Sequence, residues 1–327
     1  MSDWQIFKGN HESHKVEKWP SPPPWRNFNQ QGEQKSATQT FQTNKRVVDA
    51  VNMAIYLRRP LLVTGKPGTG KSSLAKAIAS ELELGKMLHW PINTRSTLQE
   101  GLYYYDAIAR LQDAQLNQGK GVKFSIGDYI RLGALGTAIC SKGQPKVLLI
   151  DEIDKSDIDL PNDLLNIFEE GYFVIEELQR LKKNKEYQKV TVRTYDDEEY
   201  EVENGRISCE HFPIIIMTSN GEREFPIPFK RRCIQLEIQE PDPTELTNIV
   251  KAHLDLGDNL TKDIEDTIKE FVEKRRKGQG ILATDQLLNV VFMFINKPAL
   301  DDPEEEAKEK EAIKKRLIAY LNTTGDK

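Results

Sequence analysis

The sequence predicts an α/β fold built on a parallel β-sheet and followed by a domain made only of helices. The apolar run Leu61–Val63, a glycine-rich loop and an amphipathic segment ending near Leu82 follow one another, which is the order strand, loop, helix. A second apolar run, Val147–Ile150, suits a strand that is buried on both faces of a parallel sheet. From Pro241 onward apolar residues recur at helical spacing, so a domain boundary is expected near residue 240.

The loop after the first predicted strand has the spacing G-x-x-x-x-G-K-S, which is typical of phosphate-binding loops. Gly65, Gly68 and Gly70 let the backbone curl so that successive N–H groups point at an anion, and the next helix adds its positive N-terminal end. Lys71 is expected to reach the β- and γ-phosphates of a nucleotide, and the Ser72 hydroxyl to coordinate Mg²⁺. The expected nucleotide-binding residues are Gly65, Lys66, Pro67, Gly68, Thr69, Gly70, Lys71, Ser72 and Ser73.

Two carboxylates follow the second apolar run. Asp151 and Glu152 stand at the carboxyl end of the predicted strand, where a parallel sheet places its ligands. Asp151 is expected to hold Mg²⁺ through a bound water, and Glu152 to act as general base on the attacking water. Acidic residues that merely cap a strand end are common in isolation, but the phosphate loop in the same chain favours the catalytic interpretation.

A third buried strand over residues 212–219 ends at Asn220, which is predicted to orient the hydrolytic water. The alternative is an asparagine that starts a turn before Gly221. Arg231 and Arg232 follow a short helical stretch. They are either surface charge or the cations that a neighbouring subunit inserts beside the γ-phosphate.

Weaker patterns predict the other elements. Helices are expected over residues 44–56, 128–139 and 161–170, and a short strand over residues 87–92. Alternation over residues 189–202 and an Asn204-Gly205 turn predict at least one β-hairpin that projects from the core. The aromatic segment Gly101–Tyr105 belongs either to the core or an interface, or to a surface insertion that touches a substrate. The C-terminal stripes predict helices over residues 246–254, 264–272 and 285–294, with Thr284 as an N-cap, and a last helix from Asp302.

The first 43 residues form a separate, Pro-rich segment that is expected to be extended. Its aromatic residues are Trp4, Trp19, Trp25 and Phe28. The segment is either a loose tail or is pinned by these side chains to the folded chain or to a neighbouring subunit. We favour the pinned alternative, because so many aromatic side chains are costly to leave in water. The expected domains are therefore residues 1–43, 44–240 and 241–327.

Composition limits the function classes. The 327 residues carry a net charge of -5, which disfavours a protein whose main role is to coat nucleic acid. The mean hydropathy is -0.59, and no run approaches the ~18 consecutive apolar residues of a membrane span. The N-terminus lacks the pattern of a secretory signal, and the three cysteines lack metal-ligand spacing. A cytoplasmic protein is therefore expected.

With these motifs in this order, the chain resembles AAA+ ATPases, and more narrowly the MoxR group. The phrase Val147–Lys155 and the helix Leu164–Gly171 are similar to that group's Walker B strand and the helix after it. The resemblance covers about residues 40 to 295. It implies a five-stranded parallel sheet, a helical lid, and hydrolysis of ATP with Mg²⁺ at the subunit interfaces of a ring, usually a hexamer. It also implies that hydrolysis moves a partner protein.

The resemblance gives each motif a family role. Lys71 and Ser72 match Walker A, Asp151 and Glu152 match Walker B, and Asn220 matches sensor 1. Either Arg231 or Arg232 matches the arginine finger. The aromatic segment and the predicted hairpin lie where the MoxR group carries its two insertions. Many members have an arginine at the start of the third lid helix, where this chain has Ala283-Thr284-Asp285-Gln286, so sensor 2 is unassigned. Arg275 and Arg276 are the nearest substitutes.

The leading functional hypothesis is an ATP-driven remodeller of a protein partner, which in MoxR-like systems often bears a von Willebrand A domain. A second hypothesis is a nucleotide-dependent signalling switch that assembles but turns over slowly. A third is a nucleic-acid motor or a restriction-type GTPase. A small-molecule kinase fits least, because Glu152 and the arginine pair have no role in it.

Overall fold

The computed structural model describes residues 6, 15–16, 19–26, 41–116, 124–257, 260–277, 283–296, 305 and 308–315. The chain divides into two compact units. The sheet unit contains Thr43–Lys66 and Gly70–Gln239, and the helical unit contains Met1–Gln42, Pro67–Thr69 and Glu240–Lys327. The three-part domain division with boundaries at residues 43 and 240 stays a prediction.

The sheet unit contains the predicted parallel sheet of five strands. The strands are β1 (Leu61–Thr64), β2 (Leu88–Pro91), β5 (Val147–Asp151), β10 (Ile214–Ser219) and β11 (Ile234–Glu237). Their order is β11-β1-β10-β5-β2, and every neighbouring pair is parallel. Because β10 lies between β1 and β5, the carboxyl ends of these three strands lie next to one another. This edge is where ligands bind in parallel α/β sheets.

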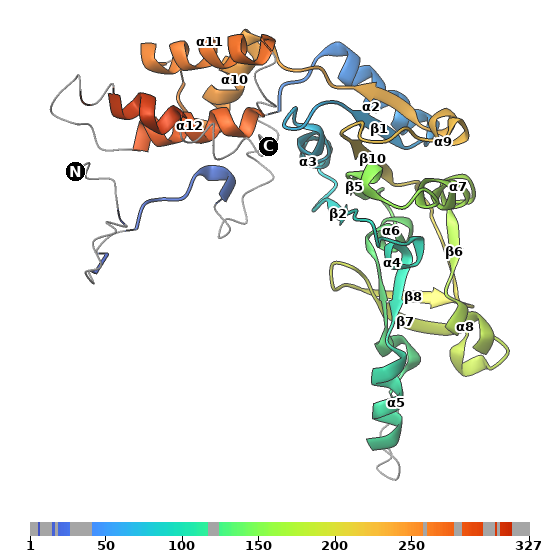
Figure 1. Cartoon of the computed structure of the whole chain (residues 1–327). Helices are drawn as coiled ribbons and strands as arrows, with labels where there is room; N and C mark the ends of the chain where they lie inside the picture. The colour runs from blue at the N-terminus through green and yellow to red at the C-terminus, as the bar shows by residue number, and fades with distance from the viewer. Residues whose placement is uncertain are drawn as a thin grey trace. The chain divides into compact units, whose positions relative to one another are not determined.

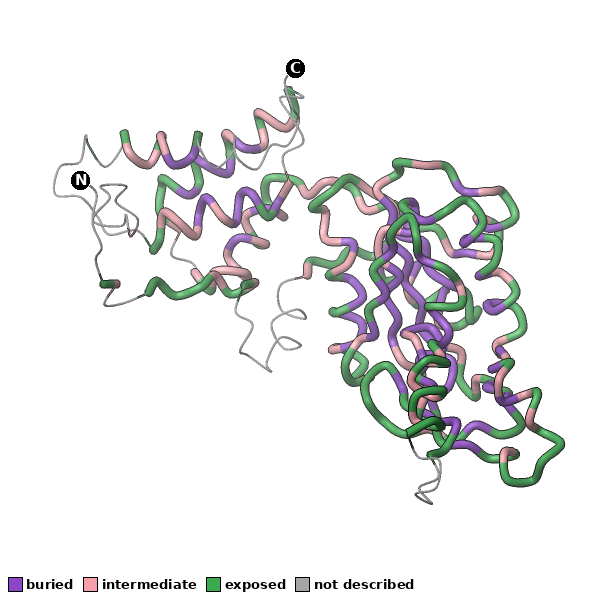
Figure 2. Tube along the Cα trace, turned by 60° about the horizontal axis from the view of Figure 1, so that its bottom comes forward, coloured by how far each residue is buried: buried purple, intermediate pink, exposed green. Residues whose placement is uncertain are grey.

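The central strands are buried because they are apolar on both faces, as a sheet covered by helices requires. Val63, Leu148, Ile150, Ile216 and Met217 have no exposed surface. Helix α2 (Lys45–Leu57) contacts β11 and β1, α3 (Lys71–Glu81) contacts β5 and β10, and α6 (Ala134–Ile139) contacts β2 and β5. Helix α7 (Leu160–Glu170) packs against α9 (Ile227–Arg232) (Figure 1). Figure 2 shows buried residues concentrated along the strands of this unit.

A second sheet, of six strands, also belongs to the sheet unit, and the sequence pattern does not predict it. Its order is β3-β4-β7-β8-β9-β6. Its strands are β3 (Tyr103–Tyr105), β4 (Ile130–Leu132), β6 (Tyr172–Val174), β7 (Lys189–Arg193), β8 (Glu199–Glu203) and β9 (Arg206–Ser208). Most of these strands are only three residues long, which is too short for a periodicity to be recognised.

The predicted helix over residues 128–139 is wrong. The chain instead runs through the 3-10 helix η2 (Ile126–Tyr129) and the strand β4, and only α6 is helical. Ile130 and Leu132 are buried while Arg131 between them is exposed, which is the alternation of a strand. In so short an apolar stretch the helical and strand periods resemble each other, and pairing with β3 and β7 decides the outcome.

Strands β7 and β8 form the predicted hairpin, and a turn at Asn204 and Gly205 leads into β9. Both turn residues have positive φ, 52° and 71°, as tight hairpin turns require. The hairpin does not simply project from the core, however. Val190, Val192 and Val202 lie in the buried cluster of the sheet unit. The charged residues of the hairpin lie on its other face, which is exposed to solvent.

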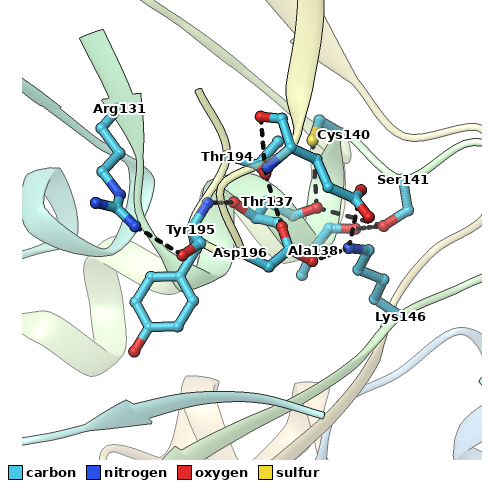
Figure 3. A network of polar contacts seen from close by, with 10 residues as sticks. Arg131, Thr137, Ala138, Cys140, Ser141, Lys146, Thr194, Tyr195 and Asp196 are labelled. Atoms are coloured by element: carbon cyan, nitrogen blue, oxygen red, sulfur yellow. Dashed lines mark hydrogen bonds and ion pairs between the residues drawn. The ribbon is translucent and has the colours of Figure 1, made fainter. Parts of the chain in front are cut away.

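The turn between β7 and β8 is joined to the neighbouring elements by a polar network (Figure 3). The Tyr195 backbone N–H donates to Thr137 Oγ1 at 2.8 Å, and Arg131 Nη2 donates to the Tyr195 carbonyl at 3.0 Å. Lys146 forms an ion pair with Asp196. These contacts fix the turn against α6 and against the start of β5.

The aromatic segment is divided between core and surface. Tyr103 is 3% exposed, lies near Phe173 with ring centroids 6.4 Å apart, and donates to Glu177 Oε2 at 2.9 Å. Tyr104 is exposed. The core alternative is therefore confirmed for Tyr103, and contact with a substrate stays a prediction for Tyr104. The flanking helices are α4 (Leu98–Leu102) and α5 (Ala107–Leu116), and α5 extends away from both sheets without a buried residue (Figure 1).

The helical unit contains the predicted C-terminal helices. They are α10 (Pro243–Leu254), α11 (Lys262–Arg276) and α12 (Thr284–Asn296), and a further helical stretch covers residues 308–315. Their shared core is Leu246, Val250, Ile264, Ile268, Phe271, Leu287, Leu288 and Val291. Thr284 is the first helical residue instead of the N-cap, and Ala283 N donates to the Gln286 side chain at 3.1 Å. The predicted start of the last helix at Asp302 lies outside the described residues. None of the described helices has the length and apolar character to cross a membrane.

One aromatic residue of the N-terminal segment packs onto these helices. Trp25 lies in the 3-10 helix η1 (Pro24–Arg26), and its ring makes edge contacts with His253 at 6.3 Å and Phe292 at 5.8 Å. This contact supports the pinned alternative at Trp25. Trp19 is exposed, while Trp4 and Phe28 lie outside the described residues.

The half-buried His253 predicts a pH dependence of stability. Burial lowers the pKa of His253 below 6.5. A folded pKa below the unfolded value means that neutral His253 contributes its full stability above about pH 6.5, and that this contribution is lost as the pH falls through the folded pKa. The melting temperature should therefore fall more steeply between about pH 7 and pH 5.5 in the native chain than in His253→Leu. If the melting temperatures of the two proteins fall equally steeply over this pH range, the prediction is contradicted.

Candidate functional site

The candidate site lies at the carboxyl edge of the parallel sheet. The phosphate loop follows β1, Asp151 ends β5 and precedes Glu152, and Asn220 follows β10 directly. Residues that are about 70 to 150 positions apart in the sequence thereby meet at one edge, because β10 pairs with both β1 and β5. The predicted catalytic side chains other than the arginines meet here.

The backbone of the phosphate loop adopts conformations that its glycines permit. Gly65, Gly68 and Gly70 have φ of 153°, 75° and 87°, which side-chain-bearing residues rarely adopt. Helix α3 begins at Lys71. Lys71 Nζ donates to the carbonyls of Gly65 at 2.7 Å and Lys66 at 2.8 Å, so the ammonium folds over its own loop. Burial lowers the pKa of Lys71, and the nearby carboxylates oppose this shift.

Asp151 is the centre of a hydrogen-bond cluster. Its Oδ1 accepts from Ser72 Oγ at 2.8 Å and from Thr218 Oγ1 at 2.5 Å, and its Oδ2 lies 3.3 Å from His89 Nε2. Burial alone would raise the pKa of Asp151, but the hydrogen bonds from His89, Thr218 and Ser72 outweigh it and lower the pKa to about 2. Asp151 is therefore an anion throughout the physiological pH range.

The adjacent Ser72 and Asp151 oxygens fit Mg²⁺. Both are hard oxygen donors, and Mg²⁺ is usually held by one or two such protein ligands together with substrate phosphates and water. Ser72 Oγ and Asp151 Oδ1 lie 2.8 Å apart, so these two residues would be the ones to hold the ion, Asp151 through a bound water.

Glu152 is held from three directions. Its backbone N–H donates to Thr218 Oγ1 at 2.9 Å, Lys155 Nζ lies 2.7 Å from its Oε2, and Asn220 Nδ2 lies 3.5 Å from its Oε1. Its φ is 61°, in the left-handed region, which costs free energy in a residue other than glycine. The Glu152 side chain is 42% exposed, so it remains accessible to water.

The two arginines lie apart from this cluster. Arg232 forms an ion pair with Glu169, and Arg231 is exposed, while its carbonyl accepts from Arg59 Nη1 at 3.0 Å. Within the part of the chain that the structure describes, neither arginine bonds to the loop, Asp151, Glu152 or Asn220. Arg275, one of the two substitutes for sensor 2, lies over the Phe271 ring and 3.5 Å from Glu240. These contacts give Arg275 a structural role.

Sequence reasoning missed three contributors to the cluster, namely Thr218, His89 and Lys155. Thr218 had a signal, because it and Ser219 are hydroxyl residues at the end of an apolar strand, and Thr218 is fully buried. His89 and Lys155 had none, since a single histidine in a short strand and a lysine after an acidic pair are usual surface residues. Only the pairing of β2 with β5, which places His89 opposite Leu149, brings the His89 ring within 3.3 Å of Asp151 Oδ2.

In the parallel five-stranded sheet, β1 lies beside β10, the strand that Asn220 follows, and the phosphate loop lies at the carboxyl edge. This arrangement defines an AAA+ type P-loop protein. The family described as AAA domain (dynein-related subfamily) matches residues 60–233, more than half of the chain, and the chain belongs to this family. Among solved structures, PCH-2 of C. elegans is similar with a TM-score of 0.45 and 16% sequence identity, over 88% of this chain and 72% of that chain. No curated protein matches the sequence significantly.

Proposed function

We propose that this AAA+ protein binds ATP with Mg²⁺ and hydrolyses it at the carboxyl edge of its parallel sheet. The observation that carries the proposal is the convergence of Ser72, Asp151, Glu152 and Asn220 beside a loop with the backbone of a phosphate site. Gly65, Lys66, Pro67, Gly68, Thr69, Gly70, Lys71, Ser72 and Ser73 form the proposed nucleotide-binding loop. The choice of adenine over guanine rests on the family.

Each side chain has one task in the proposed reaction. Lys71 leaves the carbonyls of its own loop and donates to the phosphate oxygens instead. Ser72 and Asp151 would hold Mg²⁺, which would supply positive charge to the β- and γ-phosphates. Glu152 accepts a proton from the attacking water, and the Asn220 amide orients that water. Thr218 keeps both Walker B residues in place through its hydroxyl.

We further propose that the protein belongs to the MoxR group, assembles into a hexameric ring and remodels a partner protein in the cytoplasm. The phrase Val147–Lys155 supports the group, and the exposed Arg231 supports completion of the site by a neighbouring subunit. A partner with a von Willebrand A domain fits the same group. The proposed domains are residues 1–43, 44–240 and 241–327, with the last acting as the lid.

Trapping the ATP-bound assembly tests the remodelling proposal. Glu152→Gln in ATP should elute as a stable oligomer by size exclusion with light scattering, and the tagged protein should retain a partner that the Lys71→Ala variant does not. A Glu152→Gln protein that stays monomeric at saturating ATP would refute the ring.

A slow signalling switch is the second candidate, and one contact favours it. Lys155 Nζ holds the Glu152 carboxylate at 2.7 Å, which competes with proton transfer from water. If this pair restrains the enzyme, Lys155→Ala will raise steady-state turnover above the native rate. A remodeller would already turn over rapidly in the native form, and the variant would gain nothing.

Asn220→Ala should reduce the rate and leave binding intact. Misplacing a reacting group by about 1 Å can cost roughly 100-fold, so we expect kcat to fall by roughly 10- to 100-fold. The dissociation constant for ATP should change less than about threefold, since the Asn220 side chain is 3.5 Å from Glu152 and forms no hydrogen bond with the phosphate loop among the described residues. A parallel loss of affinity in a binding titration would instead place Asn220 in nucleotide binding.

A further inference from the structure

The turn after β5 carries a third acidic residue, which the proposed reaction does not use. Asp154 lies in the 3-10 helix η3 (Ile153–Lys155) and is only 5% exposed. Its Oδ2 accepts from the backbone N–H groups of Asn220 at 2.9 Å and of Glu222 at 3.1 Å. Its Oδ1 is buried and has no hydrogen-bond partner among the residues that the structure describes. A buried carboxylate is costly, so its retention at this place calls for a specific role.

The two backbone donors converge on Asp154 because the chain turns between them. Gly221 has a φ of 78°, and its own N–H donates to Ser219 Oγ at 3.0 Å. A second connection follows, in which Arg223 Nη1 donates to the Ser156 carbonyl at 2.8 Å. The loop after β10 is therefore tied to the turn after β5 at two neighbouring points, and Asp154 makes the one next to Asn220.

We propose that Asp154 is a positioning residue that holds the loop after β10 so that the Asn220 amide faces Glu152. The Asn220 to Glu152 contact is 3.5 Å, at the outer limit of a hydrogen bond, so a small movement of the loop would break it. The inference rests on the proposed roles of Asn220 and Glu152 and deepens them. Asp154 acts through the backbone of Asn220 and makes no contact with nucleotide in this proposal.

The side chain of Asp154 also lies among the carboxylates that act on Lys71. Burial lowers the pKa of Lys71, and Asp154 opposes this shift most, ahead of Asp151 and Glu152. The variant Asp154→Asn isolates the hydrogen-bond acceptor, because the amide keeps an acceptor oxygen and removes the charge.

Hydrogen exchange of the nucleotide-free full chain tests whether Asp154 holds the loop after β10, and it requires no enzymatic activity. Removing the acceptor in Asp154→Ala should make the Asn220 and Glu222 amides exchange at least about tenfold faster, while Asp154→Asn should stay within about threefold of the native chain. Asp163→Ala, which removes an exposed carboxylate from α7, should leave both amides unchanged. Native-like exchange in Asp154→Ala overturns the inference. If Asp154→Ala does not fold, exchange in Asp154→Asn that is faster than this limit overturns it equally.

Kinetics then separate positioning from a general loss of structure. Asp154→Ala should lower kcat by roughly 10- to 100-fold with KM for ATP within about threefold, and Asp154→Asn should recover most of the rate. In an Asn220→Ala background, Asp154→Ala should cost less than about twofold more, since both changes remove the same contact. Losses that multiply would overturn the inference. Equal turnover by native protein and Glu152→Gln would refute the proposed function instead. The exchange result would still show whether Asp154 holds the loop after β10.

Discussion

Glu152→Gln is expected to bind ATP normally and to lose nearly all hydrolysis. A general base contributes roughly 10²- to 10⁴-fold to a rate, and the glutamine amide keeps the size of the side chain but cannot accept a proton from water. The contacts that hold the residue in place, including the hydrogen bond from its N–H to Thr218, do not depend on the carboxylate. Single-turnover phosphate release measures the effect.

The matched control for this prediction is Glu170→Gln, an exposed glutamate at the end of α7. It should hydrolyse ATP at the native rate. If Glu152→Gln also turns over at the native rate, Glu152 is not the base and the catalytic assignment at the end of β5 is wrong.

The second large effect is expected at Arg231. An arginine supplied by a neighbour is worth roughly 10³- to 10⁵-fold in comparable phosphoryl-transfer sites. Arg231 is exposed and has no side-chain hydrogen bond or ion pair among the described residues, whereas Arg232 is paired with Glu169. Arg231 is therefore the better candidate for the finger, and Arg231→Ala alone should be nearly inactive although its own loop is intact.

Mixing tests whether Arg231 acts on a neighbour. Arg231→Ala and Lys71→Ala are each inactive alone in this account, yet some interfaces in a mixture pair an intact loop with an intact arginine. Partial recovery of ATP hydrolysis is the expected result. Subunits that demonstrably exchange without any recovery would exclude a shared site. The same mixture with Arg232→Ala in place of Arg231→Ala decides between the two arginines.

The phosphate loop and the central strands could be predicted because their signals are local. Gly65, Gly68 and Gly70 have the backbone angles that their spacing predicts, and the apolar runs before Asp151 and Asn220 form the buried strands β5 and β10. These residues need no distant partner to be recognised, since glycine permissiveness and burial on both faces are properties of the segments themselves.

The second sheet and the supports of the site could not be predicted in the same way. Ile130 and Leu132 fit a helix as well as a strand, and only their pairing partners decide between the two. Asp154 follows an acidic pair and has the composition of a solvent-exposed turn, yet it is buried because two N–H groups of another loop point at it. The contacts of Asp154 join residues 66 and 68 positions apart, and neither segment alone shows that they form.

The most direct test of the central claim is ATP hydrolysis by the purified native chain beside Lys71→Ala and Lys76→Ala. Lys71 is the loop cation of the proposed site, while Lys76 is an exposed lysine on the same helix. We predict Mg²⁺-dependent phosphate release by the native chain and by Lys76→Ala, and neither nucleotide binding nor release by Lys71→Ala. Native-level binding and hydrolysis in Lys71→Ala would show that the loop after β1 is not where the nucleotide reacts.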